Sequence, residues 1–273
     1  MIGRSLRISA TLVATAIFAM PIYLALVNVF KPSARILSNP ISLPNPISLT
    51  NLQRVVNRPD HLLSDGLVTS VSVTTVSLVF VTVIASMLSY YIARRDSRFS
   101  RVLLPVLLLG LMIPPQVILG PATLVLRAIG LMTTFPGLIL YNIGAHLPFA
   151  VFVFVAFIRT IPRDIDDAAK IDGAGSWQTF WRVIFPLLRP ATSSVLIFVG
   201  VGVWNDFLNP WIILGPVNGN TITVGIYRVL GQYEADYGSQ FAFMFLALLP
   251  IMAFFIVLQR QFVAGLMSGS TKG

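Results

Sequence analysis

A polar segment between two long apolar stretches carries the most informative residue spacing in this chain. It holds Asp167-Ala168-Ala169, then Gly173 six positions after Asp167, then Val183-Ile184-Phe185-Pro186. The chain has no cysteine and only two histidines, which excludes disulfides, zinc ribbons, thiol chemistry and a histidine-rich metal site. Carboxylates, small residues and a glycine at these spacings are therefore suited to docking a partner.

Local signals in this segment predict a short first helix that ends at a glycine. Pro162 suits the first turn, where a missing N–H costs nothing. Three carboxylates follow where the helix dipole favours negative charge: Asp164, Asp166 and Asp167. Gly173 is placed to end the helix in the left-handed conformation. One predicted face, on which small alanines would let a partner approach closely, comprises Ile165, Ala168, Ala169 and Asp172.

A second short helix is expected directly after the glycine. Ser176 can cap it, and Pro186 is expected to end it. Its apolar stripe is formed by Trp177, Phe180, Trp181 and Ile184. From these features alone, two readings stay open: a surface that docks another protein, or an amphipathic hairpin lying on lipid headgroups.

The spacing of this segment resembles the EAA loop of ATP-binding-cassette (ABC) importer permeases. That loop has Glu-Ala-Ala, three residues, Gly, nine residues and then Ile-x-Leu-Pro, and the intervals are intact here. Asp172 and Ala174 beside Gly173 also match the form common in sugar permeases. Three conservative departures occur at the conserved motif positions: Asp167 for glutamate, Val183 for isoleucine and Phe185 for leucine.

The resemblance implies that the first short helix is a coupling helix, which inserts into a groove of a separate ATPase. The residues it assigns to ATPase coupling are Asp167, Ala168, Ala169, Asp172, Gly173, Ala174 and Pro186. No Gly-x-x-x-x-Gly-Lys-Ser/Thr loop occurs in the chain. We therefore expect a transport subunit that is not an enzyme and binds no cofactor itself, with ATP and Mg held by the partner ATPase.

Composition identifies the elements that must position this loop. The chain is 56% hydrophobic and 11% charged, far below the quarter charged that is usual in soluble domains. Since a bilayer core needs about 20 apolar helical residues, the apolar runs predict an all-α membrane protein. Its six transmembrane helices are expected near 8–30, 66–93, 102–125, 137–158, 191–214 and 239–258. The resemblance implies the type I ABC importer permease fold.

Basic residues predict the orientation. Counted by loop, 13 lysines and arginines fall on one side of the six spans and 6 on the other, which accounts for all 19. The positive-inside rule then places both termini and the loop 159–190 in the cytoplasm. We expect a multi-pass protein of the cytoplasmic (inner) membrane. Residues 1–273 would form a single permease domain with a cytoplasmic tail at 259–273.

Four polar side chains inside the predicted spans are candidates for the translocation path: Asn142, His146, Asn205 and Asp206. A carboxylate at membrane depth is costly and normally faces protein or water. Two roles stay open for each residue, either lining the path of a hydroxyl-rich solute or forming structural contacts. For Asp206 the structural alternatives are a bond to a partner subunit or a helix kink.

Further resemblance points to the carbohydrate-uptake branch, close to the smaller membrane subunit of the maltose permease. It rests on Trp204-Asn205-Asp206-Phe207 and on Gln259-Arg260-x-Phe262-Val263-x-Gly265-Leu266. It implies four kinds of partner: a second, non-identical permease subunit, two ATPase subunits, an extracytoplasmic solute-binding protein and the lipid bilayer, with no nucleic acid.

The alternative function is an ion- or proton-coupled secondary transporter, with Asp206 and His146 as coupling residues.

Two loops are expected on the outer face. The proline-rich stretch 31–64 is predicted to have little regular structure. By analogy with the family, 215–238 would contact the binding protein through its turn at 218–220 and through three tyrosines: Tyr227, Tyr233 and Tyr237.

Overall fold

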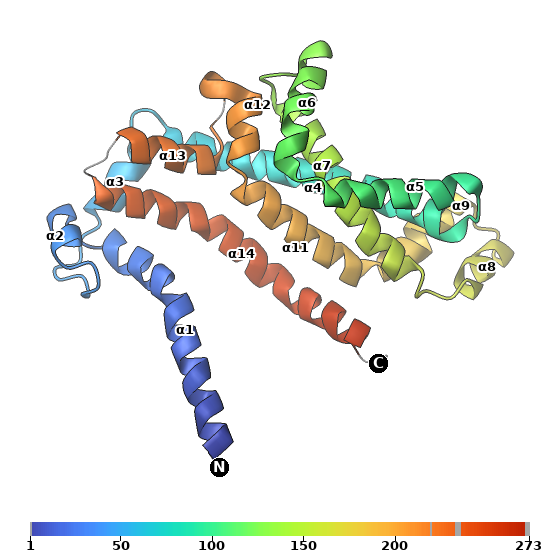
Figure 1. Cartoon of the computed structure of the whole chain (residues 1–273), viewed down its shortest axis with the longest axis horizontal. Coiled ribbons are helices and arrows are strands. Elements are labelled where there is room, and N and C mark those ends of the chain that lie inside the picture. The colour runs from blue at the N-terminus through green and yellow to red at the C-terminus, as the bar shows by residue number, and fades with distance from the viewer. Residues whose placement is uncertain (1, 219, 233–235, 271–273) are drawn as a thin grey trace. The chain divides into compact units, whose positions relative to one another are not determined.

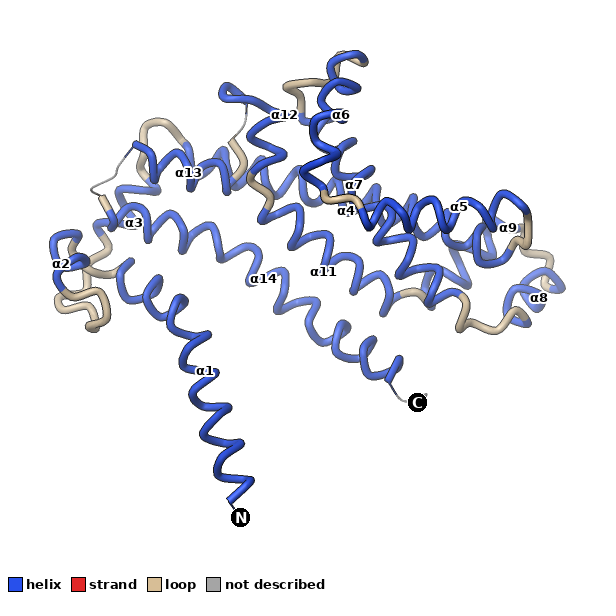
Figure 2. Tube along the Cα trace, viewed as in Figure 1, coloured by secondary structure: helices blue, strands red, loops and turns tan. Residues whose placement is uncertain are grey.

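The computed structural model describes residues 2–218, 220–232 and 236–270, and every regular element in these ranges is a helix (Figure 2). This confirms the predicted all-α fold. The order of the elements can be followed in Figure 1: α1 (Ile2–Val29), α2 (Ser33–Ser38), α3 (Thr50–Val56), α4 (Leu62–Arg94), α5 (Arg98–Leu109), η1 (Gly110–Met112), α6 (Pro115–Ala128), α7 (Phe135–Ile158), α8 (Asp164–Ile171), α9 (Ser176–Gln178), η2 (Thr179–Ile184), α10 (Phe185–Leu187), α11 (Arg189–Asn205), α12 (Leu208–Asn218), α13 (Ile222–Gln232) and α14 (Tyr237–Ser270).

Four helices in the described part of the chain are long and apolar enough to cross a bilayer, namely α1, α4, α7 and α14. Two bent pairs raise the number to six if each pair counts as one span. In the first, α5 and η1 meet α6 at 109°, and in the second, α9–α10 meet α11 at 74°. The chain is thus a multi-pass membrane protein, and the first bent pair lies where an uninterrupted third span was expected.

The predicted third span, 102–125, is not a continuous helix. The 3-10 turn η1 ends at Met112, Pro114 is extended (φ −56°, ψ 132°), and α6 starts at Pro115. A proline lacks an N–H and disfavours helical backbone at the residue before it, so two consecutive prolines break the helix. Pro105 and Pro121, by contrast, lie inside α5 and α6.

The predicted fifth span, 191–214, is also interrupted. Helix α11 ends at Asn205, and Asp206 has extended backbone (φ −68°, ψ 126°). The Asp206 carboxylate accepts hydrogen bonds from Asn209, from the backbone N–H at 3.2 Å and from the side-chain Nδ2 at 2.7 Å. Asp206 thus caps the start of α12, which matches the helix-kink role left open for it.

The described chain falls into two compact units, and the larger one comprises 69–219 and 251–273. Helix α7 is its centre, because it contacts α5, α6, α11 and α12. Leu138, Phe154 and Ile158 of α7 are fully buried, as is Val195 of α11. A Cβ on Gly200 would lie 3.0 Å from the Phe254 ring, so this glycine permits close packing of α11 and the second half of α14.

The smaller unit comprises 1–68 and 220–250. Its stretch 31–64 contains α2 and α3, so the expectation of little regular structure is wrong. The reason is a tertiary contact: the Asn51 amide of α3 donates to the carbonyls of Val29 (3.1 Å) and Lys31 (2.7 Å), where α1 has no further intrahelical partners. Helix α13 likewise occupies much of 215–238, whereas Tyr233 and Gly219 lie outside the described residues.

Candidate functional site

Helix α8 positions the predicted coupling residues. It starts at Asp164, so Pro162 precedes the helix and is not in its first turn. At its end, Gly173 has φ +79°, as expected for a left-handed cap. The Gly173 N–H donates to Lys170 O (3.0 Å) and the Ala174 N–H to Ala169 O (2.9 Å). These bonds satisfy terminal carbonyls and fix the turn that follows the helix.

The faces of α8 differ from the predicted arrangement. Ala169 is buried against the protein and Ile165 is half-buried, while Ala168 and Asp172 are exposed. The two alanines therefore do not share one outward face, and only Ala168 is open to a partner. The predicted face was wrong because the direction of a short helix is set by its tertiary contacts.

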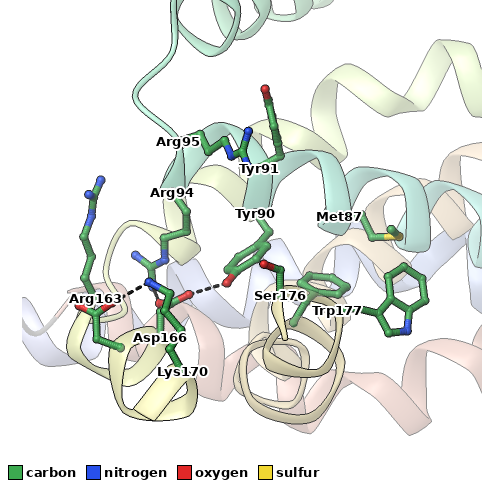
Figure 3. A pocket seen from close by; sticks show the side chains of 12 residues that line it. Met87, Tyr90, Tyr91, Arg94, Arg95, Arg163, Asp166, Lys170, Ser176 and Trp177 are labelled. Carbon is green, nitrogen blue, oxygen red and sulfur yellow. Dashed lines mark hydrogen bonds and ion pairs between the residues drawn. The ribbon is translucent and has the colours of Figure 1, made fainter. Parts of the chain in front are cut away.

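Those contacts centre on Asp166, which the sequence did not single out. Its Oδ2 lies 2.8 Å from Arg94 Nη2, and the Tyr90 hydroxyl donates to its Oδ1 at 2.6 Å (Figure 3). Arg94 Nη2 also donates to the Ile161 carbonyl at 3.1 Å. The Arg94 and Asp166 side chains are only 12% and 7% exposed. A buried ion pair of this kind is costly to break from one side, so it holds α8 to the end of α4.

The neighbouring carboxylate, Asp167, points outward. It forms an exposed ion pair with Lys170 at 2.7 Å. The hydrogen bond from Lys170, aided by its charge, holds the pKa of Asp167 below the ordinary value. Asp167 is therefore ionised on the outer surface of α8, where Lys170 balances its charge.

The helix after the glycine is anchored by its aromatic stripe. Gly175, not Ser176, is its N-cap, and Pro186 lies inside α10, so the helical run ends at Leu187. Phe180 is buried, with its ring 5.3 Å from that of Tyr90 and 4.9 Å from that of Trp181. The stripe thus packs mainly on the protein itself.

Two large apolar side chains of this loop are more than half exposed. Ile171, at the end of α8, is 87% exposed, and Trp177, in α9, is 64% exposed. Between α4, α8 and α9 lies a pocket of about 620 Å³, with Tyr90, Asp166 and Trp177 among its lining residues (Figure 3). The loop is thus anchored on its inner side and exposes apolar and acidic side chains on its outer side.

Three of the four translocation-path candidates lie together. Asn142 is buried and donates to Ser77 Oγ at 3.3 Å, while its Oδ1 has no hydrogen-bond partner among the described residues. His146 Nδ1 is 3.0 Å from the Asn142 carbonyl oxygen, and the His146 ring packs against Gly202 of α11, four positions before Asp206. Tyr141, which the sequence did not single out, is buried beside Asn142 in the chain. The Asn205 side chain is exposed.

Comparison with known proteins identifies the fold and the family. Residues 82–267 match the family described as binding-protein-dependent transport system inner membrane component. The chain is 33% identical to the diacetylchitobiose uptake system permease protein of Streptomyces coelicolor, covering 94% of this chain and 85% of that one. It is 35% identical to the trehalose transport system permease protein of Mycobacterium tuberculosis, covering 89% and 88%.

A solved structure shares the architecture. A chain of a bacterial ABC transporter involved in the import of the acidic polysaccharide alginate superposes with a TM-score of 0.81 at 18% identity, covering 95% of this chain and 96% of that one. At this identity the likeness concerns the fold. Together with the family match over residues 82–267, it confirms the resemblance to ABC importer permeases: the chain belongs to the family of binding-protein-dependent transport system inner membrane components.

Proposed function

We propose that this chain is the permease subunit of a binding-protein-dependent ABC importer that moves a sugar or related polyol across the cytoplasmic membrane. Relatives named for the uptake of diacetylchitobiose and of trehalose support the substrate class. The loop sequence around Gly173 has the form common in sugar permeases. Both termini and the loop 159–190 then lie in the cytoplasm, as the excess of basic residues predicts.

The two sides of α8 differ, and this difference supports a role in coupling. Its inner side is fixed by the Asp166–Arg94 pair, and its outer side exposes Asp167, Ala168 and Ile171. A partner ATPase that binds ATP and Mg would grip the outer side. Asp172 belongs to the same surface, Gly173 and Ala174 form the turn that shapes it, and Ala169 and Pro186 contribute from within the loop.

The anchoring of α8 to α4 explains how a movement of α8 would reach the membrane-spanning helices. Closure of two ATPase subunits on ATP would displace α8, and the Asp166–Arg94 pair would carry that displacement into α4. ATP binding would thus bias the transporter between two conformations through differential contacts. A second, non-identical permease subunit would complete the path. The loop 215–238, in which Tyr227 is exposed, would meet the extracytoplasmic binding protein.

The path itself is proposed to run past the polar groups near the break between α11 and α12. Asn142, His146 and Asp206 gather there, and Asn205 stands beside them in sequence with an exposed side chain. Polar groups at membrane depth normally face protein or water. Hydroxyl groups of a sugar would find both donors and acceptors among these side chains.

ATPase activity of the reconstituted complex tests this proposal. The complex would contain this chain, its second permease and the ATPase subunits, with or without a binding protein loaded with candidate sugars. We expect strong stimulation of ATP hydrolysis by one loaded binding protein. Failure of this chain to co-purify with any ATPase, together with uptake driven by an ion gradient in liposomes, would overturn it in favour of a secondary transporter.

A further inference from the structure

A second cleft, of about 710 Å³, opens between the α4–α5 turn and the connection from α7 to α8. It adjoins the pocket of the coupling loop and shares Arg94, Arg95 and Arg163 with it. Its charged lining consists of five arginines and one aspartate: Arg94, Arg95, Arg101, Arg159, Arg163 and Asp96. The pocket of the coupling loop, by comparison, is lined by four basic and two acidic residues.

Most of that positive charge is not neutralised. Arg94 is paired with Asp166, and Arg101 lies 3.3 Å from Asp96. Arg95 rests on the Tyr91 ring, 5.5 Å from its centroid, a contact that leaves its charge in place. The two remaining arginines, Arg159 and Arg163, form no ion pair within the described residues. Five guanidinium groups against two carboxylates leave three positive charges at one opening.

The same cleft continues into apolar surface. Leu104 and Pro105 of α5 form part of its wall. Next to Pro105 on the surface of α5 lie Val102 and Leu109, three positions before it and four after it, and their side chains are 62% and 58% exposed. Because α5 belongs to a bent pair with the composition of a membrane span, this surface is suited to contact with the acyl chains of lipids. The ligand that fits is therefore an amphiphile with an anionic head.

We propose that this cleft binds the phosphate headgroup of an anionic phospholipid, whose acyl chains lie along α5. Arginine forks match phosphate oxygens in a bidentate manner. A carboxylate of a protein partner would satisfy the charge but would leave the apolar surface of α5 unused. Such a lipid site is separate from transport and requires only that the chain spans a membrane. Basic pockets beside spanning helices are a recurrent form of headgroup site.

Native mass spectrometry of the full chain in detergent, titrated with phosphatidylglycerol or with phosphatidylcholine, tests this site. We expect one phosphatidylglycerol to be retained at least about tenfold more tightly than phosphatidylcholine. Since each basic residue near a headgroup contributes about 1 kcal/mol, Arg159→Gln with Arg163→Gln should weaken retention by roughly tenfold or more. The matched control is Arg98→Gln, because Arg98 is an exposed arginine of the same turn that does not line the cleft. It should retain the lipid like the native chain.

A charge-conserving variant keeps the test valid if the double glutamine variant does not fold. Arg159→Lys with Arg163→Lys preserves the charge but not the bidentate geometry, and it should retain phosphatidylglycerol more weakly than the native chain does. Equal retention of the two lipids, or equal loss in Arg98→Gln, would overturn the site. Displacement by inorganic phosphate at equal concentration would mark a free-anion site, and displacement by the partner ATPase would mark a protein contact. Either outcome overturns the lipid proposal, and neither depends on transport.

Discussion

Two adjacent aspartates in α8 have opposite environments, although both were expected to favour the start of the same helix as first-turn carboxylates. Asp166 is buried with Arg94 and Tyr90, whereas Asp167 is exposed with Lys170. Removing the buried partner leaves Arg94 uncompensated, which costs about 3–5 kcal/mol in comparable pairs. We predict that Asp166→Ala lowers the thermal unfolding midpoint of the detergent-purified chain by several degrees. Asp167→Ala should leave it unchanged.

The same two variants distinguish the attachment of α8 to α4 from the binding of α8 to the ATPase. Asp167→Ala should weaken binding to the partner ATPase, measured by titration of the purified subunits, because the Asp167 carboxylate lies on the proposed contact surface. Unaltered stability in Asp166→Ala would show that the pair does not hold α8 to α4. Unaltered ATPase affinity in Asp167→Ala would remove this carboxylate from the contact surface.

Two glycines of the coupling loop form a matched pair for a second prediction. Neither would meet another atom within 4 Å if given a Cβ, but Gly173 has φ +79° and Gly175 has φ −68°. A left-handed backbone costs an L-residue about 1–2 kcal/mol. Gly173→Ala should therefore distort the turn and reduce ATPase stimulation several-fold, and Gly175→Ala should not. Equal activity of the two variants would contradict a role for the turn geometry.

Residue-scale features were predictable where their cause is local. The left-handed Gly173 follows from its place at the end of a short acidic helix, and the structure confirms it. The buried pair of Arg94 and Asp166 was not predictable, because 72 positions separate the two residues and no spacing rule links them. The inward direction of Ala169 was missed for the same reason, since that pair determines how α8 is turned.

At the scale of elements, hydropathy located the spans but not their breaks. Apolar length identifies a helix, whereas interruptions depend on single residues such as the consecutive Pro114 and Pro115 or the capping Asp206. The prolines were visible in the sequence as sites of bending. The helix ends there because the backbone at Pro114 is extended, and the hydropathy pattern does not encode that conformation.

The start of α14 gives a pH-dependent prediction. Burial raises the pKa of Asp236, but hydrogen bonds from Ser239 and from Arg54, with the charge of Arg54, outweigh this and hold that pKa below its usual value. A carboxylate with a lowered folded-state pKa stabilises the fold above its unfolded-state pKa of about 4. That stability is lost as the pH falls through the lower, folded-state pKa.

We therefore expect Asp236→Asn to lower the unfolding midpoint at pH 7. The difference from the native chain should stay constant down to about pH 5 and shrink as the pH falls below about 4. Thermal unfolding in detergent across this range measures it. Arg54→Gln removes one hydrogen-bond donor to Asp236 and should reduce the pH-dependent part of the difference. A difference that is the same at pH 3 and pH 7 would contradict the assignment.

At the scale of the whole molecule, the two bent pairs decide the topology. If each pair crosses the membrane, the chain has six spans, and the N-terminus and α8 lie on the same side. If both pairs are re-entrant, only α1, α4, α7 and α14 cross. The N-terminus and α8 then lie on opposite sides, and α8 could not meet an ATPase on the side of the N-terminus. Hydropathy alone does not distinguish these arrangements, but the distribution of basic residues favours six spans.

Single-cysteine labelling in intact cells distinguishes the six-span from the four-span arrangement, because the native chain has no cysteine and gives no background. We predict that Ile171→Cys, on α8, reacts with a membrane-impermeant maleimide only after the cells are opened. Tyr227→Cys, on α13, should react in intact cells, because both counts place α13 outside, and it serves as the positive control. Reaction of Ile171→Cys in intact cells would establish the four-span arrangement. The exposed side of α8 would then face away from ATP, and its acidic and apolar residues would require a partner other than an ATPase.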